Sequence, residues 1–91
     1  MPSSIEFSRP ALRRLQQIPE RERGLIRGKI AALAEDRRSQ ANNVKLLQGY
    51  DGIFRLRVGD WRVIYRDDID TLRIIDIESR QQVYGKGKRK W

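Results

Sequence analysis

The feature of the sequence that most limits its fold is a strict alternation of apolar and charged side chains in the second half of the chain. From residue 54 to residue 58 the apolar positions are Phe54, Leu56 and Val58, and arginines stand between them. This alternation is typical of a β-strand with one buried side and one side facing solvent. The pair Gly59-Asp60 follows, and a glycine at the first of two turn residues indicates a tight β-hairpin. The sequence therefore predicts two antiparallel strands with arginines opposite the apolar side.

Further strands are expected on both sides of this hairpin, and the first half of the chain has helical spacing. Ser8 is a candidate helix N-cap, Pro19 ends the first helix, and a second apolar stripe fades near Arg38 before the polar stretch 39–43. We expect strands at residues 3–7, 44–47, 53–58, 61–66 and 72–78, with a brief extended segment at Val83-Tyr84.

These elements predict a small α+β domain. It consists of an N-terminal strand, a two-helix hairpin and a three- to four-stranded antiparallel sheet, with the helices packed on one face. A chain of 91 residues supports one hydrophobic core, so we expect a single domain over residues 1–91 with a basic tail at about 85–91.

The composition excludes several classes of chemistry. The chain contains no cysteine and no histidine, which removes disulfides, thiolate zinc sites, cysteine nucleophiles and histidine acid–base catalysis. We expect no metal and no cofactor. The formal net charge of +8 indicates a polyanionic partner or an acidic protein. No apolar run approaches the roughly 20 residues of a membrane span, and no secretory signal is visible, so we expect a cytoplasmic protein that does not contact membranes.

Four arginines are expected on the open face of the sheet. Arg55 and Arg57 alternate with the apolar residues of one strand, and Arg62 and Arg66 lie on the next strand. Like charges about 5 Å apart across a strand pair destabilise a sheet, and a phosphate backbone would compensate them well. The alternatives are a solvated face or a docking face for an acidic protein.

Two further groups of residues near the C-terminus each have two alternative roles. The tail cations either provide solubility or contact phosphates; they are Lys86, Lys88, Arg89 and Lys90. Tyr84 either covers the edge of the sheet or contributes a phenol for base stacking or proton transfer, and Arg80 precedes it by four residues.

Three segments in order carry a resemblance to a known family. They are Lys45-Leu46-Leu47-Gln48-Gly49, the hairpin sequence FRLRVGDWRVIY at 54–65, and Arg80 with Val83-Tyr84. Their order and spacing resemble the RelE/ParE toxin superfamily over residues 4–84. The resemblance implies the RelE-like fold and a toxin of a type II toxin–antitoxin system.

The RelE branch of this superfamily cuts mRNA in the ribosomal A site without a metal ion. The ribose 2′-hydroxyl attacks the adjacent phosphate and leaves a 2′,3′-cyclic phosphate and a 5′-hydroxyl. Carried onto this chain, the resemblance implies catalytic roles for Arg55, Arg57, Arg62, Arg80 and Tyr84. With this function, we expect the remaining cations to contact RNA or the ribosome; they are Arg66, Lys45, Lys86, Lys88, Arg89 and Lys90. The implied partners are a cognate antitoxin that is not in this chain, the ribosome with its mRNA, and operator DNA only through the toxin–antitoxin complex.

One departure from the family concerns the general base. Relatives can carry lysines where this chain has Arg55 and Arg57, and arginine does not give up its proton. Either Tyr84 accepts the 2′-hydroxyl proton, or the ribosome positions the RNA well enough that no strong base is needed. Two other functions remain as alternatives: the ParE branch, which poisons DNA gyrase and usually lacks the full late arginine–tyrosine set, and a non-enzymatic basic binding module.

Overall fold

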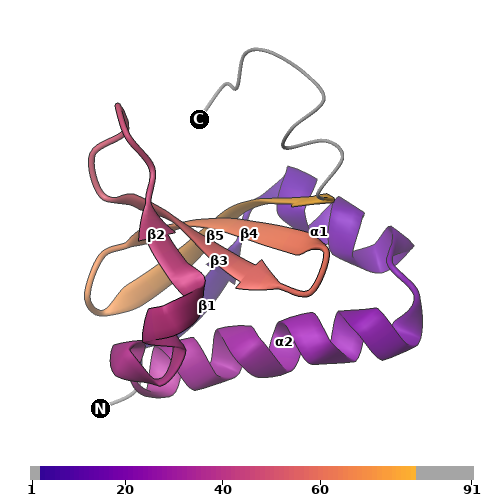
Figure 1. The fold of residues 1–91 in the computed structure, drawn as a ribbon. Coiled ribbons are helices and arrows are strands. Elements are labelled where there is room, and N and C mark those ends of the chain that lie inside the picture. The colour runs from indigo at the N-terminus through magenta and orange to yellow at the C-terminus, as the bar shows by residue number, and fades with distance from the viewer. Residues whose placement is uncertain (1–2, 80–91) are drawn as a thin grey trace.

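The computed structural model describes residues 3–79 and has the predicted α+β architecture (Figure 1). In chain order its elements are β1 (Ser4–Phe7), α1 (Arg9–Gln17), α2 (Glu20–Glu35), the 3-10 helix η1 (Arg37–Asn43), β2 (Val44–Leu46), β3 (Ile53–Val58), β4 (Trp61–Asp67) and β5 (Thr71–Ser79). The predicted extended segment at Val83-Tyr84 lies outside the described residues. In the described part, no helix is long and apolar enough to cross a membrane.

The five strands form one mixed sheet in the order β1-β5-β4-β3-β2. Strands β2 to β5 form the predicted antiparallel meander, and β1 joins its far edge by pairing in parallel with β5. The connection from the second helix to the sheet differs from the prediction. The second helix ends at Glu35, before Arg38, and the polar stretch that follows is helical, because the side chain of Asp36 caps η1 by accepting a hydrogen bond from the Arg38 amide.

The first helix begins as its sequence predicts. Ser8 has an extended backbone, and its hydroxyl oxygen accepts a hydrogen bond from the Ala11 amide at 3.1 Å. Pro10 lies in the first turn, where a missing amide hydrogen costs nothing. The helix ends at Gln17, ahead of Pro19.

One face of the sheet and the two helices enclose the core. Residues from α1, α2 and every strand from β3 to β5 form a single buried cluster, in which Leu15, Ile26 and Val63 are fully buried. Phe54 and Trp61 pack against this cluster. The ring of Phe54 stacks on that of Tyr65, with the ring centroids 5.6 Å apart. The opposite face is less open than predicted, since Ile64 is only 1% exposed. Its strand, β4, has neighbours on both sides, which restricts access to a side chain of this size.

The β3–β4 connection is the two-residue turn that the sequence predicts. Val58 pairs with Trp61, so only Gly59 and Asp60 lie between the strands. Gly59 has a φ of +59°, a backbone region that residues with a Cβ atom rarely adopt. The turn therefore sets the register of both strands.

Arg37, the first residue of η1, forms a set of hydrogen bonds that connects the C-terminal end of α2 with the region of the β4–β5 turn. The Arg37 guanidinium binds both carboxylate oxygens of Asp67, at 2.8 and 3.0 Å. It also donates to the Ser3 hydroxyl and to backbone carbonyls at Leu33 and Ile69. The hydrogen bond from Arg37 lowers the pKa of Asp67 below its ordinary value. One side chain thus links α2, the chain before β1 and the β4–β5 turn.

We predict that Asp67→Asn lowers the free energy of unfolding at pH 7 by about 1–2 kcal/mol, because it removes a charge-assisted bidentate contact. The lowered pKa of Asp67 means that its stabilising contribution is present above the unfolded-state pKa of about 4 and is lost as the pH falls through the folded-state value. The stabilities of the two proteins, measured by urea unfolding between pH 7 and pH 2, should therefore converge in acid. A constant difference across that range would contradict this role.

Candidate functional site

The register of β2, β3 and β4 aligns basic side chains in rows on the face away from the helices. Arg57 on β3 lies directly opposite Arg62 on β4. In the next row Arg55 lies between Lys45 on β2 and Ile64 on β4. Side chains in such rows are about 5 Å apart. The structure therefore brings four cations from three strands together.

Arg62 is the most firmly held of these cations. It is only 6% exposed, and its Nη1 donates to the carbonyl oxygens of Gly59 at 2.9 Å and Trp61 at 3.0 Å. Nε and Nη2 form no hydrogen bond with any residue of the described range 3–79. The guanidinium is thus anchored at one nitrogen by the hairpin turn, and the edge formed by the other two nitrogens remains for a ligand. That edge matches the two oxygens of a phosphate.

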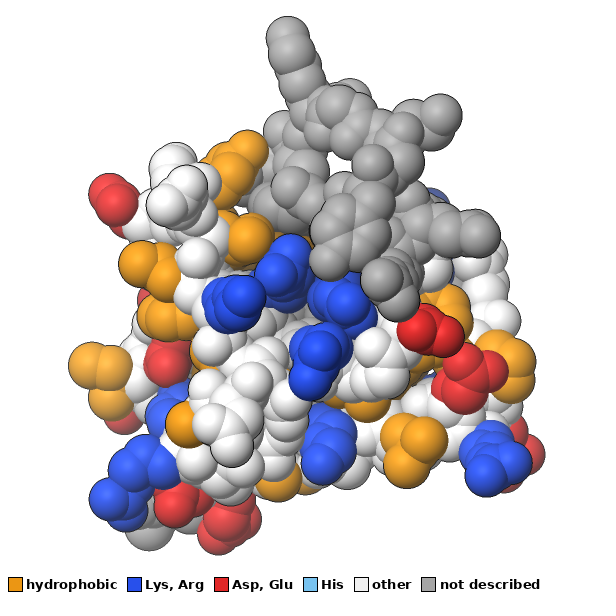
Figure 2. Space-filling view, viewed as in Figure 1, with side chains coloured by type: hydrophobic (Ala, Val, Ile, Leu, Met, Phe, Trp, Pro, Cys, Tyr) orange, Lys and Arg blue, Asp and Glu red, His pale blue; other side chains and the backbone are white. Residues whose placement is uncertain are grey.

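A pocket of 300 Å³, here called the sheet-face pocket, lies over these rows. Every side chain that lines it can donate a hydrogen bond, and none is acidic; the lining consists of Asn42, Asn43, Lys45, Arg55, Arg57 and Arg62. Figure 2 shows Lys and Arg side chains gathered in the middle of this face. Within residues 3–79, no carboxylate lies within 4.0 Å of the charged nitrogens of Lys45, Arg55 or Arg57. On the other side of β4 the row of Arg62 continues to Glu78, so a carboxylate borders the cluster there.

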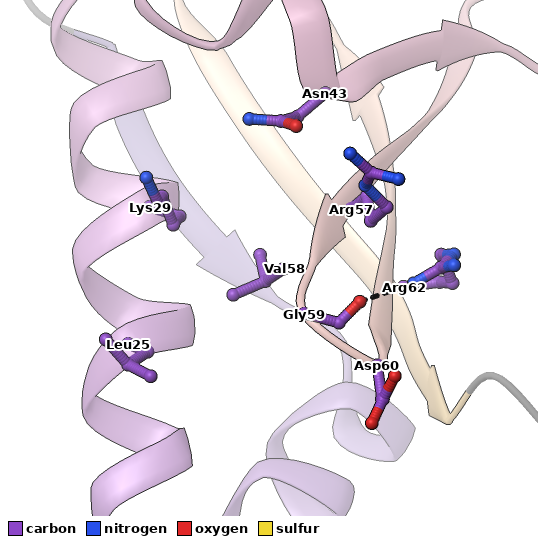
Figure 3. Close-up of a pocket in the computed structure, with 8 residues that line it drawn as sticks. All are labelled: Leu25, Lys29, Asn43, Arg57, Val58, Gly59, Asp60 and Arg62. Carbon is purple, nitrogen blue, oxygen red and sulfur yellow. Dashed lines mark hydrogen bonds between the residues drawn. The ribbon is translucent and has the colours of Figure 1, made fainter.

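A second and larger hollow adjoins the first. This side cavity has a volume of 610 Å³ and lies between α2 and the β3–β4 hairpin (Figure 3). It shares Asn43, Arg57 and Arg62 with the sheet-face pocket. Its remaining lining comes from Leu25 and Lys29 on α2 and from the turn at Val58, Gly59 and Asp60.

The structure brings together part of the predicted site. Arg55, Arg57, Arg62 and Lys45 all line the sheet-face pocket. Arg66 lines neither cavity; it lies opposite Ile53, and its Nη1 donates to the Asp51 carbonyl at 3.2 Å. The other predicted residues lie outside the described range: Arg80, Tyr84, Lys86, Lys88, Arg89 and Lys90.

Lys29, Asn42 and Asn43 were not predicted from the sequence. Both asparagines are at the end of the 3-10 helix η1, in the stretch that the sequence identifies only as polar. Lys29 lies on the long helix, one turn after Leu25, and both residues line the side cavity (Figure 3). In the sequence Leu25 belongs to the apolar stripe of the second helix, and nothing in that stripe connects it or Lys29 to the sheet.

The lining of the sheet-face pocket, as far as the structure describes it, consists of cationic and amide side chains and includes no tyrosine. Tyr65 belongs to the core on the helix side, where burial raises its pKa. Within residues 3–79, no cluster of three acidic side chains could hold a metal ion. The described part of the site can therefore bind phosphate groups and stabilise negative charge that develops on them.

The sequence and the fold match known toxins. The family model for the ParE toxin of the type II toxin–antitoxin system parDE matches residues 5–84. Comparison with curated protein sequences gives no match.

Solved structures of RelE toxins share the fold. A chain of the archaeal RelE–RelB complex from Pyrococcus horikoshii OT3 is similar with a TM-score of 0.72 and 21% identity, over 88% of this chain and 97% of that chain. The isolated RelE toxin of E. coli has a TM-score of 0.71 and 19% identity, over 91% of this chain and 92% of that chain. A chain of the RelBE2 toxin–antitoxin complex from Mycobacterium tuberculosis has a TM-score of 0.67 and 27% identity, over 88% and 100% of the two chains.

We predict that millimolar pyrophosphate raises the Tm of this protein, because an anion bound between Arg57 and Arg62 relieves their repulsion and binds only the folded state. About 1 kcal/mol of such stabilisation corresponds to a shift of about 4–8 °C in a domain of this size. Arg57→Gln should lose most of this shift without lowering the Tm in chloride alone. The measurement is differential scanning fluorimetry at constant ionic strength, and an equal shift in the wild type and Arg57→Gln would contradict the assignment.

Proposed function

Because the chain belongs to the family of ParE toxins of type II toxin–antitoxin systems, in the RelE/ParE superfamily, we propose that it is a ribosome-dependent mRNA endoribonuclease. It cleaves mRNA in the ribosomal A site in the cytoplasm and thereby inhibits translation. The observation that carries this proposal is the convergence of Arg55, Arg57 and Arg62 on one pocket whose lining contains no carboxylate. RNA is a polyanion, and arginine is the side chain best suited to bind its phosphates at two points.

The chemistry is a transfer of the phosphoryl group within the RNA strand. The 2′-oxygen attacks the adjacent phosphorus and passes its proton to Tyr84 or to water, the bond from phosphorus to the 5′-oxygen breaks, and the leaving oxygen takes up a proton from water. The products are a 2′,3′-cyclic phosphate and a 5′-hydroxyl. The transition state carries extra negative charge on the phosphate oxygens, and fixed cationic donors stabilise it most where they need no reorganisation.

In this mechanism Arg62 has the central position. Its buried guanidinium is anchored through Nη1 by the hairpin turn, so Nε and Nη2 are held in place before RNA binds. Arg57, directly opposite, and Arg55, in the adjacent row, supply further positive charge to the same phosphate. We assign Arg80 the same kind of role and Tyr84 that of proton acceptor. If Tyr84 is not needed, the ribosome aligns the RNA well enough for attack without a strong base, and solvent water takes up the proton.

A ParE-type activity is the second candidate, because the matching family model is that of the ParE toxin. In that case the basic face would bind DNA gyrase and inhibit supercoiling without cutting RNA. The preformed arginine pocket favours the nuclease, since inhibition by binding alone does not require an anchored Arg62. A third candidate, a non-enzymatic module that only holds polyanions, would leave growth unaffected when the protein is expressed alone.

We further propose an antitoxin as the physiological partner. The similar solved structures include toxin–antitoxin complexes from Pyrococcus horikoshii and Mycobacterium tuberculosis. An antitoxin segment with acidic side chains would neutralise the +8 charge of this chain and block the arginine face. Operator DNA would be bound by the complex rather than by the toxin alone.

The test is reconstituted translation of a short mRNA with added protein, followed by mapping of the RNA ends. We expect cuts within the A-site codon that require ribosomes. Arg62→Gln should lower the cleavage rate by about 10²–10³-fold, the typical cost of one donor that stabilises developing oxyanion charge. Arg13→Gln, which removes an exposed charge on α1, should cleave like the wild type.

Arg57→Gln provides a second test that does not disturb the buried anchor. It should lose cleavage while keeping the wild-type circular dichroism spectrum and Tm. Intact mRNA with a folded wild-type protein would overturn the nuclease proposal, and inhibition of gyrase supercoiling by the same preparation would establish the ParE-type activity instead.

A further inference from the structure

The side cavity has a different character from the sheet-face pocket. One wall is apolar, formed by Leu25 and Val58, and Leu25 is 57% exposed although it is a large hydrophobic side chain. Lys29 lies one helical turn after Leu25 on α2 and also lines this cavity (Figure 3). A cavity of 610 Å³ is within the range of small-molecule sites, and it combines an apolar wall with a cation.

Asn43 stands between the two hollows and contributes to both. It is half-buried, and its carboxamide forms no hydrogen bond with any residue that the structure describes. An asparagine amide can both donate and accept a hydrogen bond, which suits the edge of a nucleobase. In Figure 3 Asn43 lies at the end of the cavity away from Asp60, and its amide extends toward the α2 side.

We infer that the side cavity binds the nucleotide next to the scissile phosphate. The base lies against Leu25 and Val58, its edge contacts the amide of Asn43, and Lys29 with Arg57 binds the neighbouring phosphate. This inference rests on the proposed RNA-cleaving function and extends it, because it names residues outside the arginine rows that select the RNA sequence. Unstacked bases of single-stranded RNA are recognised in this way, by apolar contact with the ring and hydrogen bonds to its edge.

The charges around the cavity agree with this occupant. Arg57 and Arg62 separate the two hollows, so an RNA strand with one phosphate between these arginines would reach both. The acidic residue in the lining, Asp60, belongs to the hairpin turn and is exposed. Lys29 is also exposed, which leaves its ammonium group available to a phosphate at the rim.

The experiment measures binding of a short 2′-O-methylated RNA, which lacks the attacking hydroxyl, and of inorganic polyphosphate, which lacks bases. Asn43→Ala should weaken RNA binding about fivefold, the effect of one net hydrogen bond, and leave polyphosphate binding unchanged. Equal weakening of both ligands, or no weakening of either, would overturn the assignment of Asn43 to a base.

Lys29→Gln tests the phosphate contact, with Arg27→Gln as the matched control. Arg27 is exposed on the same helix, about 200° around the axis from Lys29, and does not line either cavity. Lys29→Gln should reduce the slope of log K against log salt for RNA by about 0.7, the value for one lost phosphate contact with a single strand. Arg27→Gln should leave the slope unchanged. Equal slopes for wild type and Lys29→Gln, or equal reductions in the two variants, would overturn the contact.

These measurements are independent of cleavage. If RNA binding depends on Asn43 and Lys29 as stated but no ribosome-dependent cleavage occurs, the subsite stands and the nuclease proposal falls. If Arg62-dependent cleavage occurs and the binding predictions fail, only the subsite is overturned.

Discussion

The turn at Gly59-Asp60 is the constraint on which the rest of the site depends. Because exactly two residues connect β3 and β4, Val58 must pair with Trp61 and Arg57 must lie opposite Arg62. Burial of the apolar side of both strands under the helices then directs these arginines to the other face. The same turn supplies the Gly59 carbonyl that anchors Arg62. A shift of one residue would bury the charges and expose the core, so the pairing of apolar and basic sides fixes both fold and site.

The repulsion between the arginines of β3 and β4 is offset by stabilising contacts on other elements of the domain. Opposed like charges destabilise a strand pair, and the described part of the chain places no carboxylate against Arg55 or Arg57. The charge-assisted contacts of the fold lie on other elements, chiefly the Arg37–Asp67 pair that joins the start of η1 to the end of β4. The charge-assisted contacts that stabilise the fold thus lie apart from the arginine rows.

Much of the fold was predictable from local pattern, because strand alternation, a glycine turn and the Ser8 cap each depend on neighbouring residues. The 3-10 helix η1 was not, since its polar sequence has no apolar period and its start depends on the Asp36 cap. The burial of Arg62 was missed because alternation assigns its position to solvent, whereas its nitrogen is held by backbone carbonyls. Lys29 and Asn43 were missed because only the packing of α2 and η1 beside the hairpin brings them to one cavity.

The most direct test of the central claim is single-turnover cleavage on ribosomes programmed with an mRNA that carries one 2′-deoxynucleotide in the A-site codon. If the arginine pocket stabilises attack by the 2′-oxygen, a deoxynucleotide on the 5′ side of the cut should abolish cleavage at that bond. The same substitution elsewhere in the codon should leave the cut in place, with a 2′,3′-cyclic phosphate at its end. Cleavage at the substituted position, or a message that stays intact with every substrate, would contradict the account.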